Sequence, residues 1–178
     1  MRNQKKLWVI ACLSVAMTLS AAPQRTPDVI YVPTPPGVVE AMLKMADVKK
    51  GDVVYDLGSG DGRIPIMAAE KFGAAKAIGI DIDPQRIKEA NENLAKSKVA
   101  GQVRFLNQDL FTTDFSEATV ITLYLLPSLN EKLMPKLLAL KPGTRIVSHA
   151  FLMGDWKPER TETVEGKNIY FWTVPAKK

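Results

Sequence analysis

The sequence predicts an α/β fold: a doubly wound, mostly parallel sheet with helices on both faces and an antiparallel hairpin at its C-terminal edge. Apolar, β-branched runs alternate with amphipathic helical patterns between residues 38 and 151, which is typical of a parallel sheet with crossover helices. The run VITLYLL at 120–126 is continuously apolar, as expected for a strand buried on both faces. Residues 160–174 form two alternating patterns about Glu165-Gly166-Lys167, and these predict the hairpin.

The first 22 residues differ from the rest of the chain. Arg2, Lys5 and Lys6 precede an uncharged run over residues 7–22 that ends in small side chains. This order is typical of a secretory signal peptide, and the run is short for a membrane-spanning helix. We expect residues 1–22 to be a signal peptide or an N-terminal membrane anchor. The protein is then exported to the periplasm or outside the cell, or held at a membrane, with a domain on the cytoplasmic face as the remaining alternative.

Composition narrows the possible functions of residues 23–178, whose length fits one domain. The chain has a net charge of +5, but three of its 24 Lys and Arg residues and none of its acids lie in residues 1–22, so residues 23–178 carry +2. We find no basic stripe interleaved with aromatics, so we expect no nucleic-acid partner. Cys12 and His149 are the only cysteine and histidine, which argues against disulfides, a Cys or His metal cluster and a thiol nucleophile in the domain. The sequence does not indicate an oligomeric state.

Prolines and glycines mark the boundaries of the first predicted elements of the domain. Residues 23–36 contain five prolines and are expected to form an extended linker or lid. Helical spacing of apolar residues then predicts a helix over 38–48. A strand at 53–57 leads through a glycine-rich turn to a helix at 64–72, whose Pro65 is tolerated in the first turn because the N–H there has no helical partner.

The later elements alternate in the same way. The remaining predicted strands are at 77–82, 103–106, 120–126 and 145–151, and the remaining helices are at 84–95 and 129–140. Asp83-Pro84 has an N-cap acid followed by proline at the first helical position, which favours a helix start there. The stretch FTTDFSEA at 111–118 is too short and polar to form much of a helix.

The turn between the first strand and its helix, DLGSGDGR at 56–63, places glycines at alternate positions. Glycine lets the backbone turn tightly and approach a ligand closely, and the helix that follows presents unpaired N–H groups. Asp56, Asp81 and Asp109 stand at or just after the ends of three strands, so parallel pairing brings them to one crevice. The alternative is a glycine turn that only eases packing, and the coincidence of the three acids weighs against it.

The spacing and charge of this turn restrict the ligand. In this turn the third glycine follows the second by two residues, whereas in the dinucleotide fingerprint G-x-G-x-x-G it follows by three. The chain also has no G-x-x-x-x-G-K-[ST] motif. Asp56 and Asp61 flank the turn, and negative charge there disfavours a pyrophosphate. An acid-rimmed glycine turn suits a cationic ligand that carries a ribose. S-adenosylmethionine (SAM) is such a ligand, and we expect it as the cofactor, with no metal.

Three segments resemble known motifs. DLGSGDGR at 56–63, GIDIDP at 79–84 and NQDLF at 107–111 are similar to successive motifs of the class I, seven-strand, Rossmann-like SAM-dependent methyltransferases, a likeness that covers about residues 31–175. More narrowly, YVPT at 31–34, LYLLPSLNEKL at 123–133 and SHAFLMGDWKPE at 148–159 resemble the small membrane-anchored lysine methyltransferases of the ATP synthase c-subunit and adenine nucleotide translocase type.

The resemblance implies a set of cofactor contacts. In the family pattern, the glycine turn passes under the methionine moiety, the acid at Asp81 accepts from the ribose hydroxyls, and Ile82 packs on the adenine. Asp83 is expected to act as a helix N-cap instead. The residues expected to bind SAM are Tyr31, Thr34, Asp56, Gly58, Ser59, Gly60, Asp81, Ile82, Gln108, Asp109 and Leu110.

The resemblance implies a methyl acceptor, a protein lysine, near the exit of the strand at 120–126. A lysine must be neutral to react, which at pH 7 costs roughly 4–5 kcal/mol from a pKa near 10.4. Apolar or aromatic surroundings lower that pKa, whereas a carboxylate raises it. Tyr124, His149, Phe151 and Trp156 are candidates for an aromatic acceptor wall, with cation–π contact to the amine. The alternative is that Tyr124 and Phe151 are core aromatics and His149 is a satisfied strand histidine.

Two further hypotheses compete with lysine methylation. An exported methyltransferase would lack an obvious supply of SAM, so the chain could instead be an exported, non-catalytic domain that binds SAM or a nucleoside. A methyltransferase that acts on a small molecule or lipid is the other alternative. The segment Tyr124-Leu125-Leu126-Pro127 lacks the N/D-P-P-Y motif of amide and adenine N-methyltransferases. The short connections also leave no lid domain for a bulky small substrate.

Overall fold

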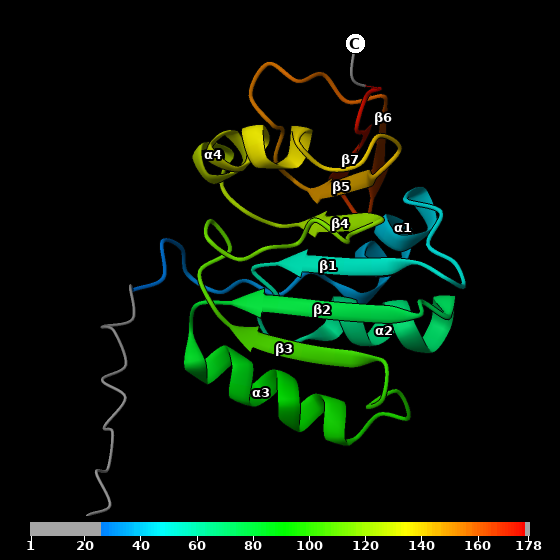
Figure 1. Cartoon of the computed structure of the whole chain (residues 1–178), viewed down its shortest axis with the longest axis vertical. Helices are drawn as coiled ribbons and strands as arrows, with labels where there is room; N and C mark the ends of the chain where they lie inside the picture. Colours follow the sequence, from blue (N-terminus) through cyan, green and yellow to red (C-terminus); the bar gives the residue numbers. More distant parts are fainter. Residues whose placement is uncertain (1–25, 177–178) are drawn as a thin grey trace, which may run out of the picture.

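The structure is a computed structural model that describes residues 26–176. Its elements are α1 (Pro36–Met45), β1 (Val53–Leu57), α2 (Arg63–Phe72), β2 (Lys76–Asp81), α3 (Pro84–Ala95), β3 (Val103–Asn107), β4 (Val120–Leu123), α4 (Pro127–Leu138), β5 (Arg145–His149), β6 (Arg160–Val164) and β7 (Lys167–Thr173) (Figure 1). The predicted signal peptide or anchor, residues 1–22, lies outside the described residues. Within residues 26–176, no helix has the length and apolar character needed to cross a membrane.

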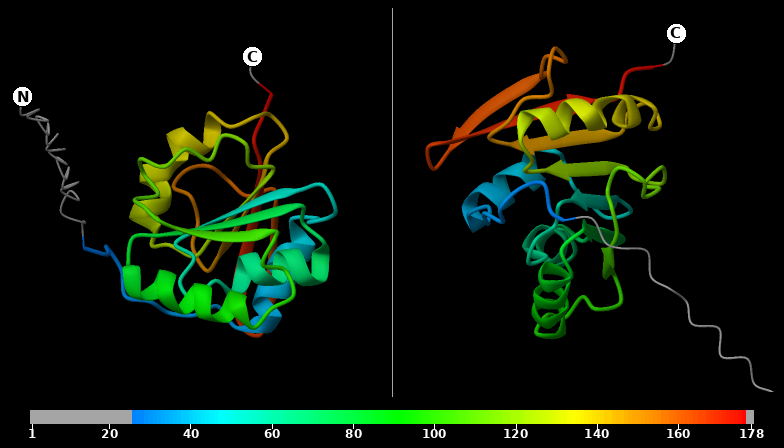
Figure 2. Two further views of the ribbon diagram at one scale, coloured as in Figure 1. Left: turned by 60° about the horizontal axis from the view of Figure 1, so that its bottom comes forward. Right: turned by 90° about the vertical axis from the view of Figure 1, so that its left-hand side faces the viewer.

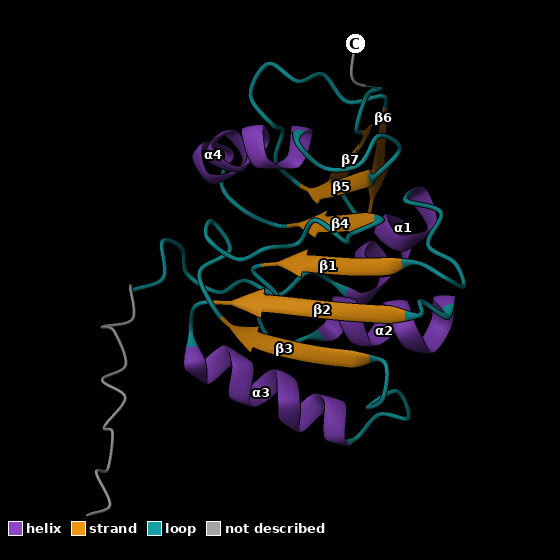
Figure 3. Ribbon diagram, viewed as in Figure 1, coloured by secondary structure: helices purple, strands orange, loops and turns teal. Residues whose placement is uncertain are grey.

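The strands form one sheet in the order β3-β2-β1-β4-β5-β7-β6 (Figure 3). The first five strands pair in parallel, whereas β7 is antiparallel to both β5 and β6. This arrangement confirms the predicted doubly wound sheet with a C-terminal hairpin. The chain runs outward from β1 in both directions, to β2 and to β4, so the carboxyl ends of β1 and β4 mark the topological switch point at which open α/β sheets bind ligands.

Apolar layers cover both faces of the sheet. One layer joins buried residues of α1, α2 and α3 to side chains such as Val54, and the other joins α4 to side chains such as Tyr55. Neighbouring residues of β1 therefore enter opposite layers, as the alternation of strand side chains requires. Figure 2 shows the helices on the two sides of the strands. Burial on both faces explains why these strands read as continuous apolar runs.

The connection between β3 and β4 contains no helix, as its polar sequence predicts (Figure 3). Phe115 anchors this connection in the layer that holds α4, with its ring centroid 6.3 Å from that of Tyr55. We call residues 108–119 the β3–β4 connection. It fills part of the sheet face that a crossover helix would otherwise cover.

The predicted strands at 120–126 and 145–151 are too long at their carboxyl ends. β4 ends at Leu123, and the next three residues leave the sheet because Pro127 begins α4 and holds Leu126 in an extended conformation, with φ −57° and ψ 153°. β5 ends at His149 because Ala150 takes a positive φ of 64° and turns the chain. Of the five residues predicted beyond these strand ends only Leu125 is buried, and Leu126 is 45% exposed, so the apolar run overstated the length of the strands.

Candidate active site

The glycine turn folds back on the neighbouring strand. The backbone N–H groups of Gly58 and Ser59 both donate to the carbonyl of Ile80, at 2.9 and 3.0 Å. Gly60 has a φ of 52°, and a Cβ placed on it would lie 2.2 Å from Cε2 of Tyr31. Glycine is therefore needed at position 60 for both its backbone conformation and the close approach of the tyrosine ring.

Asp81 joins the turn to the end of β2. Its Oδ2 accepts from the N–H of Gly60 at 2.8 Å, and its Oδ1 accepts from the N–H of Asp83 at 2.9 Å. Desolvation raises the pKa of Asp81, while these two backbone donors oppose that rise. Asp83 caps α3 through a 2.8 Å bond from the N–H of Gln85, as predicted.

Asp56 is the most deeply buried of the acids, with 2% of its surface exposed. Burial is the main cause that raises the pKa of Asp56 to about 7, and the nearby charges of Asp81 and Asp61 also raise it. The hydrogen bond that Thr122 Oγ1 donates to Asp56 at 2.7 Å acts in the opposite direction and lowers this pKa. A cation bound beside this carboxyl would favour its ionised form. The site is therefore suited to a positively charged group of a ligand.

An extended segment, residues 27–34, crosses the carboxyl ends of the strands and forms one wall of the site; we call it the strap (Figure 2). The carbonyl of Thr34 accepts from Arg63 Nη1 at 2.9 Å, and Arg63 pairs with Asp61 at 2.6 Å. The guanidinium of Arg86 lies 4.7 Å from the ring centroid of Tyr31. These contacts hold the strap against the glycine turn and α3, so this part of the predicted linker or lid, residues 23–36, packs on the domain and lines the cavity.

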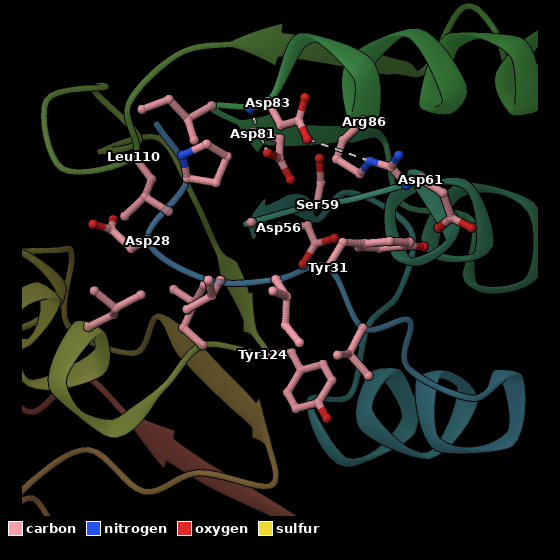
Figure 4. A pocket seen from close by; sticks show the side chains of 18 of the residues that line it. Asp28, Tyr31, Asp56, Ser59, Asp61, Asp81, Asp83, Arg86, Leu110 and Tyr124 are labelled. Carbon is pink, nitrogen blue, oxygen red and sulfur yellow. Dashed lines mark hydrogen bonds and ion pairs between the residues drawn. The ribbon is translucent and has the colours of Figure 1, made fainter. Parts of the chain in front are cut away.

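The strap, the glycine turn and the ends of β1, β2 and β4 enclose a cavity of about 300 Å³ (Figure 4), at the lower end of the volumes usual for ligand sites. Among the residues predicted to bind SAM, those that line it are Tyr31, Thr34, Asp56, Gly58, Ser59, Asp81, Ile82, Asp109 and Leu110. Gly60 and Gln108 do not line it. Gly60 lies behind the tyrosine ring and donates to Asp81, and Gln108 is exposed, with its amide oxygen accepting from Thr113 Oγ1.

Ser59 provides a local test of whether the cavity fits a polar ligand. Its Oγ is buried and has no hydrogen-bond partner, although the residue lines the cavity. Buried hydroxyls nearly always have a partner, so a ligand that bonds to Ser59 would remove this deficit. The free hydroxyl, the carboxylates of Asp81 and Asp56, and the glycine turn together fit a cationic nucleoside such as SAM.

The cavity also contains residues that the sequence did not single out. Leu129, Phe111 and Arg86 line it, as does Leu125, which the sequence placed only within the segment 124–127 and not as a site residue by itself. Leu125 and Leu129 belong to runs that predict a buried strand and the inner face of a helix, and the apolar pattern does not separate a core position from a cavity wall. Arg86 lies on α3, where its charge is typical of an exposed helix face.

Two of the candidate acceptor residues meet at the opposite end of the cavity from Asp81. Tyr124 lines this end (Figure 4), and its ring centroid lies 3.9 Å from that of His149. His149 is buried, its Nδ1 lies 3.1 Å from Thr34 Oγ1, and its Nε2 has no partner. Burial, assisted by the charge of Lys167, lowers the pKa of His149 to about 4, so the imidazole is neutral at pH 7.

The structure places Trp156 apart from the other candidates. Phe151 stacks near Tyr124 at 6.0 Å, but Trp156 packs on Trp172, with ring centroids 6.2 Å apart, and its carbonyl accepts from Trp172 Nε1 at 2.7 Å. Trp156 does not line the cavity, because the chain carries it to the hairpin after the turn at Ala150. Tyr124, His149 and Phe151 therefore lie together, but of the four candidates only Tyr124 lines the cavity, and the acceptor wall stays a prediction.

Known proteins that resemble this chain are methyltransferases. The family model of the ANTKMT methyltransferase domain matches residues 56–160. The chain belongs to this family. A relative named protein-lysine N-methyltransferase, from Saccharolobus islandicus, is 49% identical over 85% of this chain and 98% of its own length. The adenine nucleotide translocase lysine N-methyltransferase of Mus musculus is 31% identical over 80% of this chain, and the matched part spans 63% of that enzyme.

A similar solved structure indicates which cofactor the family binds. The crystal structure of an RNA methyltransferase from Salinibacter ruber in complex with S-adenosyl-L-homocysteine (SAH) is 55% identical, covers 83% of this chain and 96% of its own, and has a TM-score of 0.80. The putative methyltransferase yhhF from Escherichia coli, at 18% identity and a TM-score of 0.67, supports the fold alone. The protein is a SAM-dependent methyltransferase, as its sequence predicts. The individual contacts to SAM remain predictions.

Proposed function

We propose that this methyltransferase transfers a methyl group from SAM to the ε-amino group of a lysine in another protein. The observation that supports the proposal most is the aromatic ring of Tyr124 at the end of the cavity away from Asp81 (Figure 4), with the neutral imidazole of His149 packed against that ring. The names of the Saccharolobus and Mus relatives, both lysine methyltransferases, agree with it.

The residues around the proposed acceptor site would favour a neutral amine. SAM supplies an activated methyl group on a sulfonium, so the protein's main task is to align the acceptor with that group. Tyr124, Leu125 and Leu129 present aromatic and apolar surface, which lowers the pKa of an entering lysine. His149 lies buried against the Tyr124 ring and is neutral, so it introduces no second positive charge beside the site. The thiol-free, metal-free chemistry expected from the sequence is sufficient for such a transfer.

RNA methylation is the second candidate, because the Salinibacter structure at 55% identity is titled an RNA methyltransferase. The acceptor segment of this chain, Tyr124-Leu125-Leu126-Pro127, lacks the N/D-P-P-Y motif that accompanies methylation of exocyclic base amines. The low net charge of residues 23–178 also offers little attraction to phosphates. We therefore place lysine first.

The test is transfer of radiolabelled methyl groups by the full chain to three acceptor pools: membrane and soluble protein, total RNA, and an organic extract. We expect the label in protein, and methyl-lysine after acid hydrolysis. Label in RNA or in the organic extract would favour the second candidate or a lipid acceptor. If the protein binds SAH but labels none of the three pools, the alternative of a non-catalytic binding domain would be favoured instead.

We also propose that residues 7–22 attach the protein to a membrane or direct its export, as their apolar pattern indicates. A reporter that is active only in the cytosol, fused after Lys178, separates export from a cytoplasmic-facing anchor. We expect the fusion to sediment with membranes or to be exported, and a variant that lacks residues 7–22 to be soluble in the cytosol. A full-length fusion that is soluble in the cytosol would contradict the proposal.

A further inference from the structure

One wall of the cavity belongs to a segment without regular secondary structure. Asp109, Leu110 and Phe111 line the cavity and open the β3–β4 connection. The carboxylate of Asp109 accepts from the N–H of Phe111 at 2.9 Å, and its carbonyl accepts from the N–H groups of Thr112 and Thr113 at 3.0 and 2.9 Å. These bonds pair N–H donors of the segment with Asp109, whereas the carbonyls of Leu110, Phe111 and Thr113 accept from a different element.

A lysine on α4 is the donor to those carbonyls. The Nζ of Lys136 donates to the carbonyls of Leu110 at 3.5 Å and Phe111 at 3.1 Å, and also to the carbonyl of Thr113. An ammonium has three N–H donors, and each has a backbone acceptor here. The Nζ also lies 4.5 Å from the ring centroid of Phe115. Lys136 thus contacts four residues of the connection.

The same face of α4 makes a second contact of this kind. Lys132, one helical turn before Lys136, places its Nζ 3.8 Å from the ring centroid of Phe111. Leu129, nearer the start of α4, lines the cavity directly. The helix therefore touches the cavity at one end and holds the cavity-lining segment through its lysines.

We propose that Lys136 is a positioning residue for the cofactor: it fixes the wall formed by Asp109, Leu110 and Phe111, and so sets the affinity for SAM without touching SAM. This inference rests on the assignment of the cavity to SAM and not on the identity of the acceptor. Without the ammonium, three carbonyls lose a charged donor, and the segment relaxes away from the cavity. The acceptor end, at Tyr124, has no bond to Lys136 and should be unaffected.

Two substitutions of Lys136 distinguish the contribution of its N–H donors from that of its aliphatic stem. Lys136→Met keeps most of the stem and removes every donor. Lys136→Arg keeps the charge, but the planar fork of a guanidinium cannot aim three donors at convergent carbonyls as an ammonium does. Lys88→Met is the matched control, because Lys88 lies on α3 with 69% of its side chain exposed and pairs only distantly, at 4.0 Å, with Glu92.

The experiment is calorimetric titration of each full-length variant with SAH, followed by steady-state kinetics. For Lys136→Met we expect SAH affinity to fall about tenfold or more, as loss of charged hydrogen bonds implies, and KM for SAM to rise in parallel. We expect kcat and the KM for the acceptor to stay within about twofold. Lys136→Arg should be intermediate and Lys88→Met unchanged. Backbone amides of residues 110–115 should exchange faster in Lys136→Met.

A folded Lys136→Met variant that binds SAH within twofold of the parent would overturn the inference, and so would a fall in kcat with KM for SAM unchanged. If thermal melts show that Lys136→Met does not fold, Lys136→Arg carries the test, and parental SAH affinity in that variant overturns the inference. SAH titration needs no acceptor, so a failure to methylate lysine leaves this result readable.

Discussion

The backbone N–H of Gly60 and the carboxylate of Asp81 are joined by a 2.8 Å hydrogen bond. This bond ties the glycine turn after β1 to the end of β2, so one side chain both shapes the turn and faces the cavity. Each carboxylate oxygen has two lone pairs, and the two backbone donors use only part of this capacity. Asp81 can therefore hold the turn and still accept from a ligand hydroxyl.

Replacing Asp81 tests this double role. Asp81→Ala removes the acceptor for a ligand and for the Gly60 N–H, and we expect SAH affinity to fall about 30-fold or more, since a hydrogen bond to a charged group contributes about 1.5–3 kcal/mol. Asp81→Asn keeps one oxygen and should lose less. Glu162→Ala removes an exposed acid on the edge strand β6, outside the cavity lining, and should leave the titration unchanged. Equal SAH affinity for parent and Asp81→Ala would refute the assignment.

Asp56 should make stability depend on pH. Its folded pKa, about 7, exceeds the unfolded value near 3.9, so its contribution is fully present below about pH 4 and is lost as pH rises through 7. The slope reaches about 1.4 kcal/mol per pH unit in this window. Asp56→Asn keeps an acceptor for Thr122 and does not ionise. Urea unfolding should therefore show Asp56→Asn gaining on the parent from pH 4.5 to pH 8; parallel curves would contradict this.

The bond between Thr34 and His149 should contribute to stability. Thr34→Val removes the hydroxyl beside Nδ1 at nearly constant volume and leaves a buried imidazole with neither nitrogen paired. Loss of one partner of a buried polar pair costs about 1–3 kcal/mol. Thr34→Ser, which keeps the hydroxyl, is the control and should retain most of the stability. The check is the urea midpoint at pH 7.5, and a Thr34→Val midpoint equal to that of the parent would show the bond to be unimportant.

Tyr124 should act on the acceptor and not on the cofactor. We expect Tyr124→Ala to lower kcat/KM for the acceptor about 10- to 100-fold, because misplacement of a reacting group by 1 Å has effects of that size, with SAH affinity within about threefold. Tyr124→Phe retains the ring that stacks on His149 and should keep most of the activity. A loss of SAH binding as large as the loss of turnover would instead place Tyr124 at the cofactor.

The sequence predicted the sheet and the cofactor end of the site because both depend on local patterns. Strand and helix periods give the layers, and the acids at strand ends converge through parallel pairing alone. The acceptor end depends on long-range contacts instead. The bond from Thr34 to His149 joins residues 115 positions apart, and no period or spacing encodes it.

Other contacts escaped the sequence for a related reason. Lys136 lies in a helix whose lysines read as solvent-facing, and its three carbonyl partners belong to a segment without a recognisable period. The fate of Trp156 was set by one residue, Ala150, whose positive φ turns the chain after β5. Alanine gives no signal of such a turn, so the sequence grouped Trp156 with Tyr124, whereas in the structure it packs on Trp172.

The strap has a practical consequence for where the catalytic unit may be cut. The family model begins at residue 56 and α1 begins at Pro36, so either boundary would suggest a shorter expression fragment. A fragment that starts at α1 would keep every strand and helix found within residues 26–176, yet it would lack the tyrosine that covers Gly60 and the threonine that pairs with His149. Deletion series and fusion proteins should therefore begin upstream of Pro27. We expect a fragment that begins at Pro36 to fold but to be inactive, because one side of its cavity would be open to solvent.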